Sequence, residues 1–236
     1  MNNQFDTARD RRAIIKNGVL LAATLAVPNA VSAAARKLTQ ADLRPVSEPP
    51  LPSPAPRLAA APLTSPRVVR PDLMRRALAS LDKHGNRGLK RDRIAIADMA
   101  APSGQPRFHL VNLISGKSQS FLVAHGSGSD PAHTGWLKRF SNDDGSNASC
   151  EGAFLTADYY TGKHGSSQRL IGLDHTNSNA LSRAIVVHSA WYANKDMIRT
   201  HGMLGRSQGC FAVGEGDLDQ VFALLGPGRM IFSAKV

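Results

Sequence analysis

The sequence predicts a mainly β or α+β domain, built on a mixed, mostly antiparallel sheet with few helices, as a β-sandwich or a barrel-like sheet. Short runs in which apolar residues alternate with others fill the middle of the chain, as half-buried strands require. Helical spacing of apolar residues is confined to two segments, residues 72–81 and 216–225. The 165 residues from 72 to 236 are enough to bury one hydrophobic core.

The first helix is expected to begin at Asp72, because an aspartate side chain caps free backbone N–H groups, and to end at Gly85. The second covers residues 216–225 and stops at Gly226 and Pro227, which do not continue a helix. Each helix has one apolar face, formed in the first by Leu73, Ala77, Leu78 and Leu81 and in the second by Leu218, Val221, Phe222 and Leu225.

Six stretches beside and between these helices have the character of strands. Residues 93–98 carry isoleucine at every second position, Ile94 and Ile96. Residues 107–114 and 118–124 flank a Ser-Gly-Lys turn and therefore predict a β-hairpin. Three shorter apolar runs complete the set: 153–156, 184–188 and 229–234.

The N-terminal residues 1–35 read as an export signal. The pair Arg11 and Arg12, with Lys16, precedes a short apolar stretch, and small residues between Ala33 and Ala35 suit cleavage. This order resembles a twin-arginine signal peptide. It predicts export to the periplasm or cell envelope, with membrane contact only through this segment if it stays uncleaved.

Residues 36–71 are expected to form a linker. Nine of the 14 prolines lie between Pro45 and Pro71, and proline neither donates a backbone hydrogen bond nor enters a helix or sheet interior. An extended spacer that separates the domain of residues 72–236 from the membrane is the preferred interpretation. A ligand for a proline-binding module is the alternative.

Composition excludes several classes of protein. The chain has 29 Lys and Arg against 18 Asp and Glu, but no basic stripe interleaved with aromatic residues, so we expect no nucleic-acid partner. Residues 72–236 carry a net charge of +5, which suits a wall- or membrane-facing protein that meets anionic polymers, with solubility alone as the alternative. There is no run of eighteen apolar residues, which excludes a polytopic membrane protein. Two cysteines exclude a four-cysteine zinc site.

Cys210 and His188 are the candidate catalytic pair. His188 follows a run of branched apolar residues, and Cys210 follows Gly209 at the end of a loop. A free thiol has a pKa near ~8.5, so an adjacent imidazole is needed to create the nucleophilic thiolate at neutral pH. Gly209 lets backbone N–H groups approach a reacting carbonyl. The alternative is a small buried cysteine and an unrelated histidine.

Five segments in this order resemble the murein L,D-transpeptidase catalytic-domain family: residues 124–126, 139–142, 160–165, 183–188 and 205–210. The resemblance implies that Cys210 is the nucleophile, that His188 is the base and that Ser189 helps to hold the imidazole. The N–H groups of Cys210 and Gly209 are then the candidates for stabilising the oxyanion.

The resemblance is to a distant branch of this family. The better-known branch has histidine where this chain has Gln208, and the gap between His188 and Cys210 is longer here. These departures bear on which substrate the enzyme selects more than on which reaction it catalyses. Arg206 and Ser207, in the segment Gly-Arg-Ser-Gln-Gly-Cys, are candidates for substrate binding. Arg206 has two open roles, which are to grip a substrate carboxylate or to hold the loop.

The other histidines divide into two groups. His125 and His164 each precede a glycine, and they are candidates for lining the substrate cleft, with a structural role in their loops as the preferred interpretation. The rest lack metal-ligand spacing, so we expect no metal site and no cofactor. Cys150 is expected to be a small buried residue, since a bridge to Cys210 would silence the nucleophile.

The implied reaction is acyl transfer on peptidoglycan stem peptides. The Cys210 thiolate attacks a stem-tetrapeptide amide, D-Ala leaves, and an amine of a neighbouring stem takes the acyl group from the thioester. If water takes it, the enzyme is an L,D-carboxypeptidase. A non-catalytic wall-binding module and a metal hydrolase are the alternatives from other classes.

Overall fold

The computed structural model describes residues 68–236, so the predicted export signal and most of the predicted linker lie outside the described residues. The described part contains three α-helices: α1 (Pro71–Lys83), α2 (Lys195–His201) and α3 (Leu218–Leu225). Its eight strands are β1 (Arg93–Asp98), β2 (Phe108–Asn112), β3 (Ser118–Phe121), β4 (Gly152–Gly162), β5 (Gly165–Gly172), β6 (Val186–Ser189), β7 (Phe211–Val213) and β8 (Met230–Ala234).

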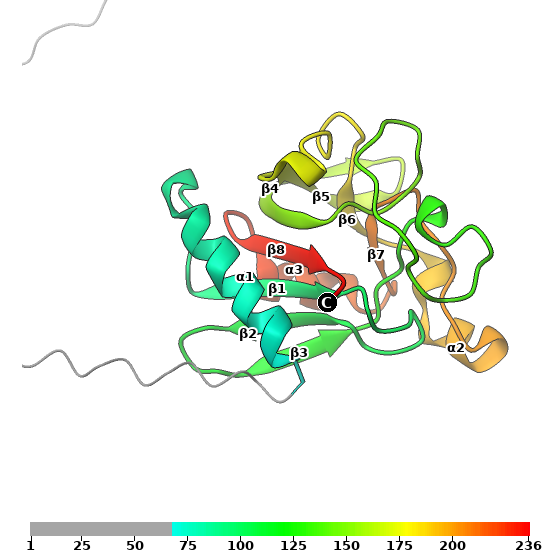
Figure 1. The fold of residues 1–236 in the computed structure, drawn as a ribbon. Coiled ribbons are helices and arrows are strands. Elements are labelled where there is room, and N and C mark those ends of the chain that lie inside the picture. Colours follow the sequence, from blue (N-terminus) through cyan, green and yellow to red (C-terminus); the bar gives the residue numbers. More distant parts are fainter. Residues whose placement is uncertain (1–67) are drawn as a thin grey trace, which may run out of the picture. The chain divides into compact units, whose positions relative to one another are not determined.

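The strands form one sheet in the order β3-β2-β1-β8-β4-β5-β6-β7 (Figure 1). Strand β1 is parallel to β8 and β6 is parallel to β7, whereas the other five pairs are antiparallel. The predicted fold class, a mixed and mostly antiparallel sheet with few helices, is therefore confirmed.

The two edges of the sheet meet through the segment that follows β3. The N–H of Ala124 donates to the carbonyl of Ala212 in β7 at 2.8 Å, and the N–H of Ser207 donates to the carbonyl of His125 at 2.9 Å. These contacts pair the continuation of β3 with β7 and with the loop before it. The sheet is barrel-like in this sense, and the edge of β7 is covered rather than open.

Alternating side chains of the sheet enter two hydrophobic clusters. In β1, Ile94 and Ile96 pack with the apolar face of α1, whereas Ala95 and Ala97 pack in the cluster that also receives α3. Accordingly, α1 and α3 lie on opposite faces of the sheet (Figure 1). A fully buried leucine, such as Leu73 of α1, contributes about 1.5–3 kcal/mol relative to an exposed one.

The ends of α1 differ from the prediction. The helix begins at Pro71 with Arg70 at the N-cap, so the expected cap at Asp72 is wrong. Proline suits this first position because its missing N–H has no partner inside the helix, and Asp72 instead pairs with Arg75. The helix ends at Lys83, and the residue that turns the chain through the left-handed region is Gly88, at φ 71°.

Three elements were not predicted: helix α2 and the strands β5 and β7. Helix α2 lies between β6 and β7, so helices are not confined to the ends of the domain. It has seven residues, none of them buried, and therefore lacks a clear apolar face. Strand β5 buries polar side chains, Ser167 and Gln168, which hide its strand pattern. Strand β4 also continues well beyond the expected 153–156.

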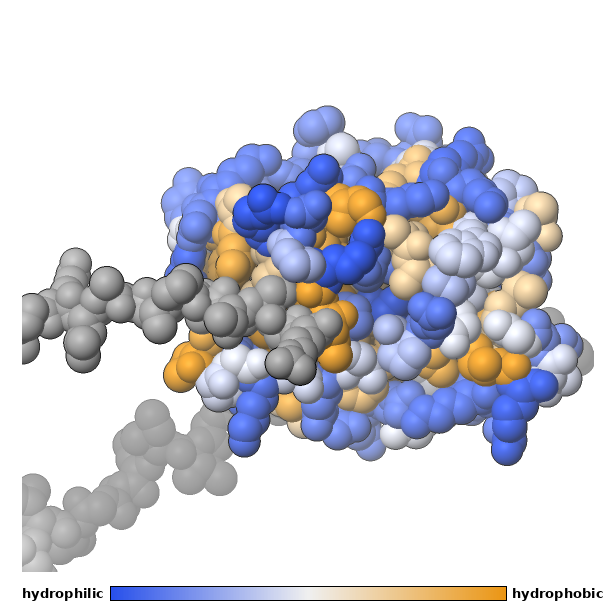
Figure 2. All heavy atoms as spheres, turned by 60° about the horizontal axis from the view of Figure 1, so that its bottom comes forward, coloured by the Kyte–Doolittle hydropathy of each residue, from blue (hydrophilic) through white to orange (hydrophobic). Residues whose placement is uncertain are grey.

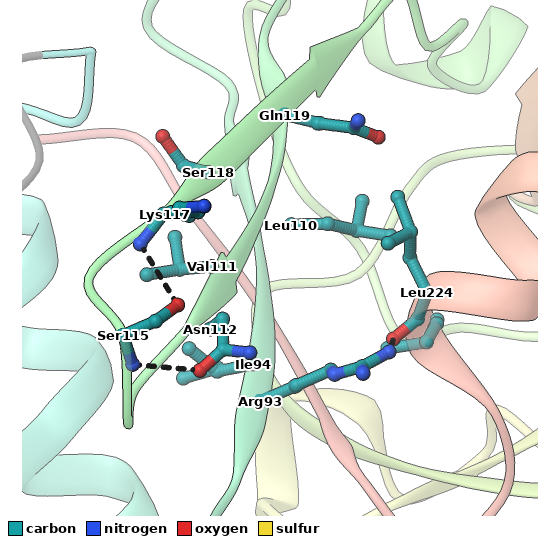
Figure 3. A pocket seen from close by; sticks show the side chains of 11 residues that line it. Arg93, Ile94, Leu110, Val111, Asn112, Ser115, Lys117, Ser118, Gln119 and Leu224 are labelled. Atoms are coloured by element: carbon teal, nitrogen blue, oxygen red, sulfur yellow. Dashed lines mark hydrogen bonds between the residues drawn. The ribbon is translucent and has the colours of Figure 1, made fainter.

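The predicted hairpin is confirmed by the antiparallel pairing of β2 with β3. At its turn the side chain of Asn112 accepts the N–H groups of Ile114 and Ser115, each at 2.9 Å, and Figure 3 shows the bond from Ser115. A cavity of about 440 Å³ lies between this hairpin and the end of α3, with Arg93 and Lys117 among its lining residues. Its lining includes neither a cysteine nor a histidine.

The surface is mostly hydrophilic on the face shown in Figure 2, where separate hydrophobic patches interrupt it. Among residues 68–236, no helix has both the length and the apolar character that crossing a membrane requires.

Candidate active site

The parallel pair β6 and β7 brings Cys210 and His188 to one cavity. His188 pairs with Ala212 in the register of these strands, and Cys210 is the residue immediately before β7. Both side chains line a cavity of about 490 Å³. Because 21 residues separate them in the sequence, this approach depends on the parallel crossover that contains α2.

The imidazole of His188 is held in one tautomer. Its Nδ1 lies 2.9 Å from the backbone carbonyl of Ser189, which can only accept, so Nδ1 carries the proton and Nε2 is left as the basic atom. Burial lowers the pKa of His188, the carbonyl of Ser189 opposes this, and His164 lowers it further. The ring is therefore neutral near pH 7, the form that can accept a proton.

The thiol of Cys210 is mostly buried, with 8% of the residue exposed, and lies 3.6 Å from the carbonyl oxygen of Ala184. Burial raises the pKa of this thiol, while the N–H of Val186 and the charge of Arg183 act in the opposite direction. The resting pair is thus a thiol and a neutral imidazole, and an imidazole base is needed to form the thiolate.

Ser207 and Gly209 shape the loop that presents Cys210. The Ser207 hydroxyl donates to the carbonyl of Cys210 at 2.8 Å and accepts the N–H of Gly209 at 3.1 Å. Gly209 has φ 114°, and a Cβ there would lie 2.6 Å from the carbonyl oxygen of Ala148, so glycine is required. Ser207 therefore holds the loop through its hydroxyl, and it also lines the cavity, as its expected place in the substrate site requires. The N–H of Gly209, one of the two expected oxyanion donors, is thus engaged by the Ser207 hydroxyl.

Arg206 holds a neighbouring loop. Its Nη1 donates to the carbonyls of Asp130 and Pro131, at 3.0 Å for the latter, and the side chain also lines the cavity. Of the two roles expected for Arg206, the structure therefore shows the contacts of the one that holds a loop in place. The guanidinium remains accessible to a substrate carboxylate from the cavity.

His164 lies at the tip of the β4–β5 hairpin and stacks on His188. His164 lines the cavity, as expected from the interpretation that it belongs to the substrate cleft and not from the one that gives it only a structural role in its loop. The lining residues that sequence reasoning missed include Tyr160, Lys163, Arg183 and Tyr192. Tyr160, Lys163 and Arg183 lie in segments that resemble the family, and this resemblance could have identified them. Tyr192 lies in none of these segments. Burial raises the pKa of Tyr192 to about 12, so its phenol stays a donor.

His125 is absent from the residues lining this cavity, and its assignment to the substrate cleft is corrected. It is 1% exposed, and its Nδ1 accepts a hydrogen bond of 2.7 Å from Arg107, which is itself fully buried. Its Nε2 lies 3.4 Å from Asp130. Burial, aided by the charge of Arg107, lowers the pKa of His125 to about 4. Because its backbone carbonyl accepts the N–H of Ser207, His125 supports the loop that precedes Cys210.

Cys150 is a free, buried cysteine, in agreement with its expected character, and it is not bridged to Cys210. Its sulfur accepts a hydrogen bond of 2.8 Å from Arg183. In the described part of the chain, His, Cys, Asp and Glu side chains do not gather in groups of three or more that could hold a metal ion.

Comparison with known proteins gives one family. The profile of a family described as "L,D-transpeptidase catalytic domain" matches residues 66–233. None of the curated proteins matches the chain.

Solved structures that resemble the chain include an L,D-transpeptidase from Mycobacterium smegmatis (12% identity, 61% of this chain and 58% of that chain, TM-score 0.37). A second is an L,D-transpeptidase from Mycobacterium tuberculosis H37Rv (14%, 61% and 58%, TM-score 0.36). A third is Bd1075 of Bdellovibrio bacteriovorus (9%, 60% and 47%, TM-score 0.38). The chain spans less than two thirds of the length of each.

Proposed function

Because the chain belongs to the L,D-transpeptidase catalytic-domain family, we propose that it is a cysteine-dependent peptidoglycan L,D-transpeptidase of a distant branch. The observation that carries the proposal is that Cys210 and a neutral His188, whose tautomer the Ser189 carbonyl fixes, line the same cavity. We further propose that residues 1–35 export it by a twin-arginine-like route and that it works in the periplasm or cell envelope. Its partners are peptidoglycan stem peptides, without nucleic acid and without a cofactor.

In the first half-reaction, Nε2 of His188 takes the proton of the Cys210 thiol. The thiolate sulfur attacks the amide carbonyl carbon of a stem tetrapeptide, a C–S bond forms, and the carbonyl oxygen becomes an oxyanion. The N–H of Cys210 stabilises this charge, and one such donor is typically worth roughly 10²–10³ in rate. The C–N bond then breaks as the imidazolium returns its proton to the leaving amine of D-Ala, which leaves a thioester.

In the second half-reaction, the amine of a neighbouring stem attacks the thioester and gives a proton to His188. A new amide bond forms, the C–S bond breaks, and the Cys210 sulfur regains its proton, so the enzyme returns to its resting form. If water attacks instead, the same groups perform L,D-carboxypeptidase chemistry. This alternative remains because the activation of Cys210 is identical in both reactions.

A wall-binding module is the second candidate from another class. Such a module needs neither a thiol and an imidazole in one cavity nor a loop that only glycine can form at position 209, φ 114°, to present that thiol. The presence of both favours the enzyme.

The deciding experiment incubates the purified chain with a disaccharide tetrapeptide and resolves the products by mass. A cross-linked dimer with release of D-Ala supports transpeptidation, and a tripeptide product supports hydrolysis. Unchanged substrate, equal to that left by a Cys210→Ala control, would sink the enzymatic proposal.

A further inference from the structure

Arg183, in the wall of the active-site cavity, is a cation that has no counter-charge among the described residues. Its guanidinium donates to the carbonyl of Ser141 at 2.8 Å, to the sulfur of Cys150 at 2.8 Å and to the carbonyl of Ala148 at 2.6 Å. All three partners are neutral. In residues 68–236, no carboxylate lies within ion-pair distance of the guanidinium. Three acceptors on two nitrogens fix its position, so the charge is both rigid and unbalanced.

The backbone turn at Ala184 places the charge of Arg183 against the loop that carries Cys210. Ala184 adopts φ 52°, a left-handed conformation that is unfavourable for a residue with a Cβ. This turn carries Arg183 back against the loop, since Nη2 lies only 3.1 Å from where a Cβ of Gly209 would stand. The carbonyl of the same Ala184 faces the Cys210 thiol at 3.6 Å. Strained backbone at such a point suggests a functional requirement.

We propose that Arg183 is a fixed positive charge that stabilises the Cys210 thiolate and the oxyanion that forms on the substrate carbonyl when this thiolate attacks it. Cys150 holds this arginine in place. This role deepens the proposed function and rests on it. A cation close to a cysteine favours its thiolate, and a preorganised charge stabilises a developing oxyanion without rearrangement. The same positive charge opposes the rise that burial causes in the pKa of Cys210.

Any pH profile also reflects the other titratable groups that line the cavity, His188, His164, Lys163, Tyr192 and Arg206, and the charge of Cys150, which raises the pKa of the Cys210 thiol. Two of them are cations. Lys163 is exposed at the hairpin tip, and Arg206 is drawn towards the carbonyls of Asp130 and Pro131. Arg183, by contrast, places Nη2 3.1 Å from where a Cβ of Gly209 would stand.

The test is the pH dependence of Cys210 alkylation by iodoacetamide in the full chain, followed by mass analysis of the peptide that contains Cys210. Removal of the charge in Arg183→Met should move the midpoint upward by about one pH unit, which is about tenfold slower alkylation near neutral pH. Arg183→Lys keeps the charge and should lie closer to the wild type. Arg76→Met, which removes an exposed charge on α1, is the matched control and should show no shift.

An unchanged midpoint in a folded Arg183→Met would overturn the inference. If that variant does not fold, Arg183→Gln replaces it, because glutamine keeps a hydrogen-bonding head without the charge. Cys150→Ala should shift the midpoint in the same direction but less, since two carbonyl contacts still hold the arginine. Alkylation needs no peptidoglycan, so an absent cross-linking activity with a shifted midpoint would contradict the proposed function alone.

Discussion

The imidazole of His164 stacks on that of His188, with ring centroids 4.5 Å apart and ring planes at 27°. The two rings come from different parts of the chain, one from the β4–β5 hairpin tip and one from β6. This contact covers one face of the proposed base, and the charge of His164 lowers the pKa of His188. The hairpin tip therefore helps to keep the base neutral.

Replacement of His164 by alanine should narrow the working pH range on the acid side. Removing the electrostatic effect of His164 and exposing the His188 ring both raise the pKa of His188, so a larger fraction is protonated at pH 6 and acylation slows there. The rate at pH 8 should change less. Acylation by a carbapenem from pH 5 to 9 measures this shift, with His175→Ala, an exposed histidine elsewhere, as the control. An acid limb that does not move would contradict the role of the stacked ring.

Cys210→Ala should abolish both turnover and covalent labelling by a carbapenem, because no other group in the cavity supplies the sulfur nucleophile. Cys150→Ala should retain most activity, with at most a several-fold loss through Arg183. Product analysis and intact mass measure the two effects. Equal loss in both variants would show that the assignment of the nucleophile is wrong.

His188→Ala should be nearly inactive near neutral pH, whereas Ser189→Ala should keep measurable activity. The contact that orients His188 comes from the backbone carbonyl of Ser189, which alanine preserves. Raising the pH should partly restore acylation in His188→Ala, since bulk ionisation of the thiol replaces the missing base. The measurement is the rate of acyl-enzyme formation from pH 6 to 9.5. Wild-type rates in His188→Ala at neutral pH would refute its role.

His125 should make the stability of the domain depend on pH. Its pKa is about 4 when folded and about 6.5 when unfolded, so the unfolded chain binds more protons between these values. The free energy of unfolding should therefore fall as the pH is lowered from about 6.5 to about 4, by about 3 kcal/mol at most from this residue. His125→Gln, which does not titrate, should show a flatter profile in urea unfolding. Identical slopes in the two proteins would rule out this contribution.

Replacement of Arg11 and Arg12 by lysines should block export and leave the precursor in the cytoplasm, because the twin-arginine route requires the pair. Fractionation and immunoblotting of the precursor and mature forms measure this. Normal processing of the variant would indicate the general secretory route instead.

Local patterns were sufficient where an element carries its own periodicity. The isoleucines of β1, the apolar faces of α1 and α3, and the turn between β2 and β3 are properties of neighbouring residues, and the structure confirms all three. Strand β5 could not be found in this way. Its buried Gln168 is stabilised by the distant carbonyl of Ala157, a partner that no local pattern reveals.

The sequence by itself determined that Cys210 and His188 are a thiol and an imidazole in segments typical of one family, and that two histidines, His125 and His164, each precede a glycine. Only the tertiary structure decided that one of these is buried against Arg107 while the other stacks in the cavity. The physical reason is that burial and charge act through space. The pKa and the accessibility of a side chain depend on residues that folding brings beside it, and these lie far away along the chain.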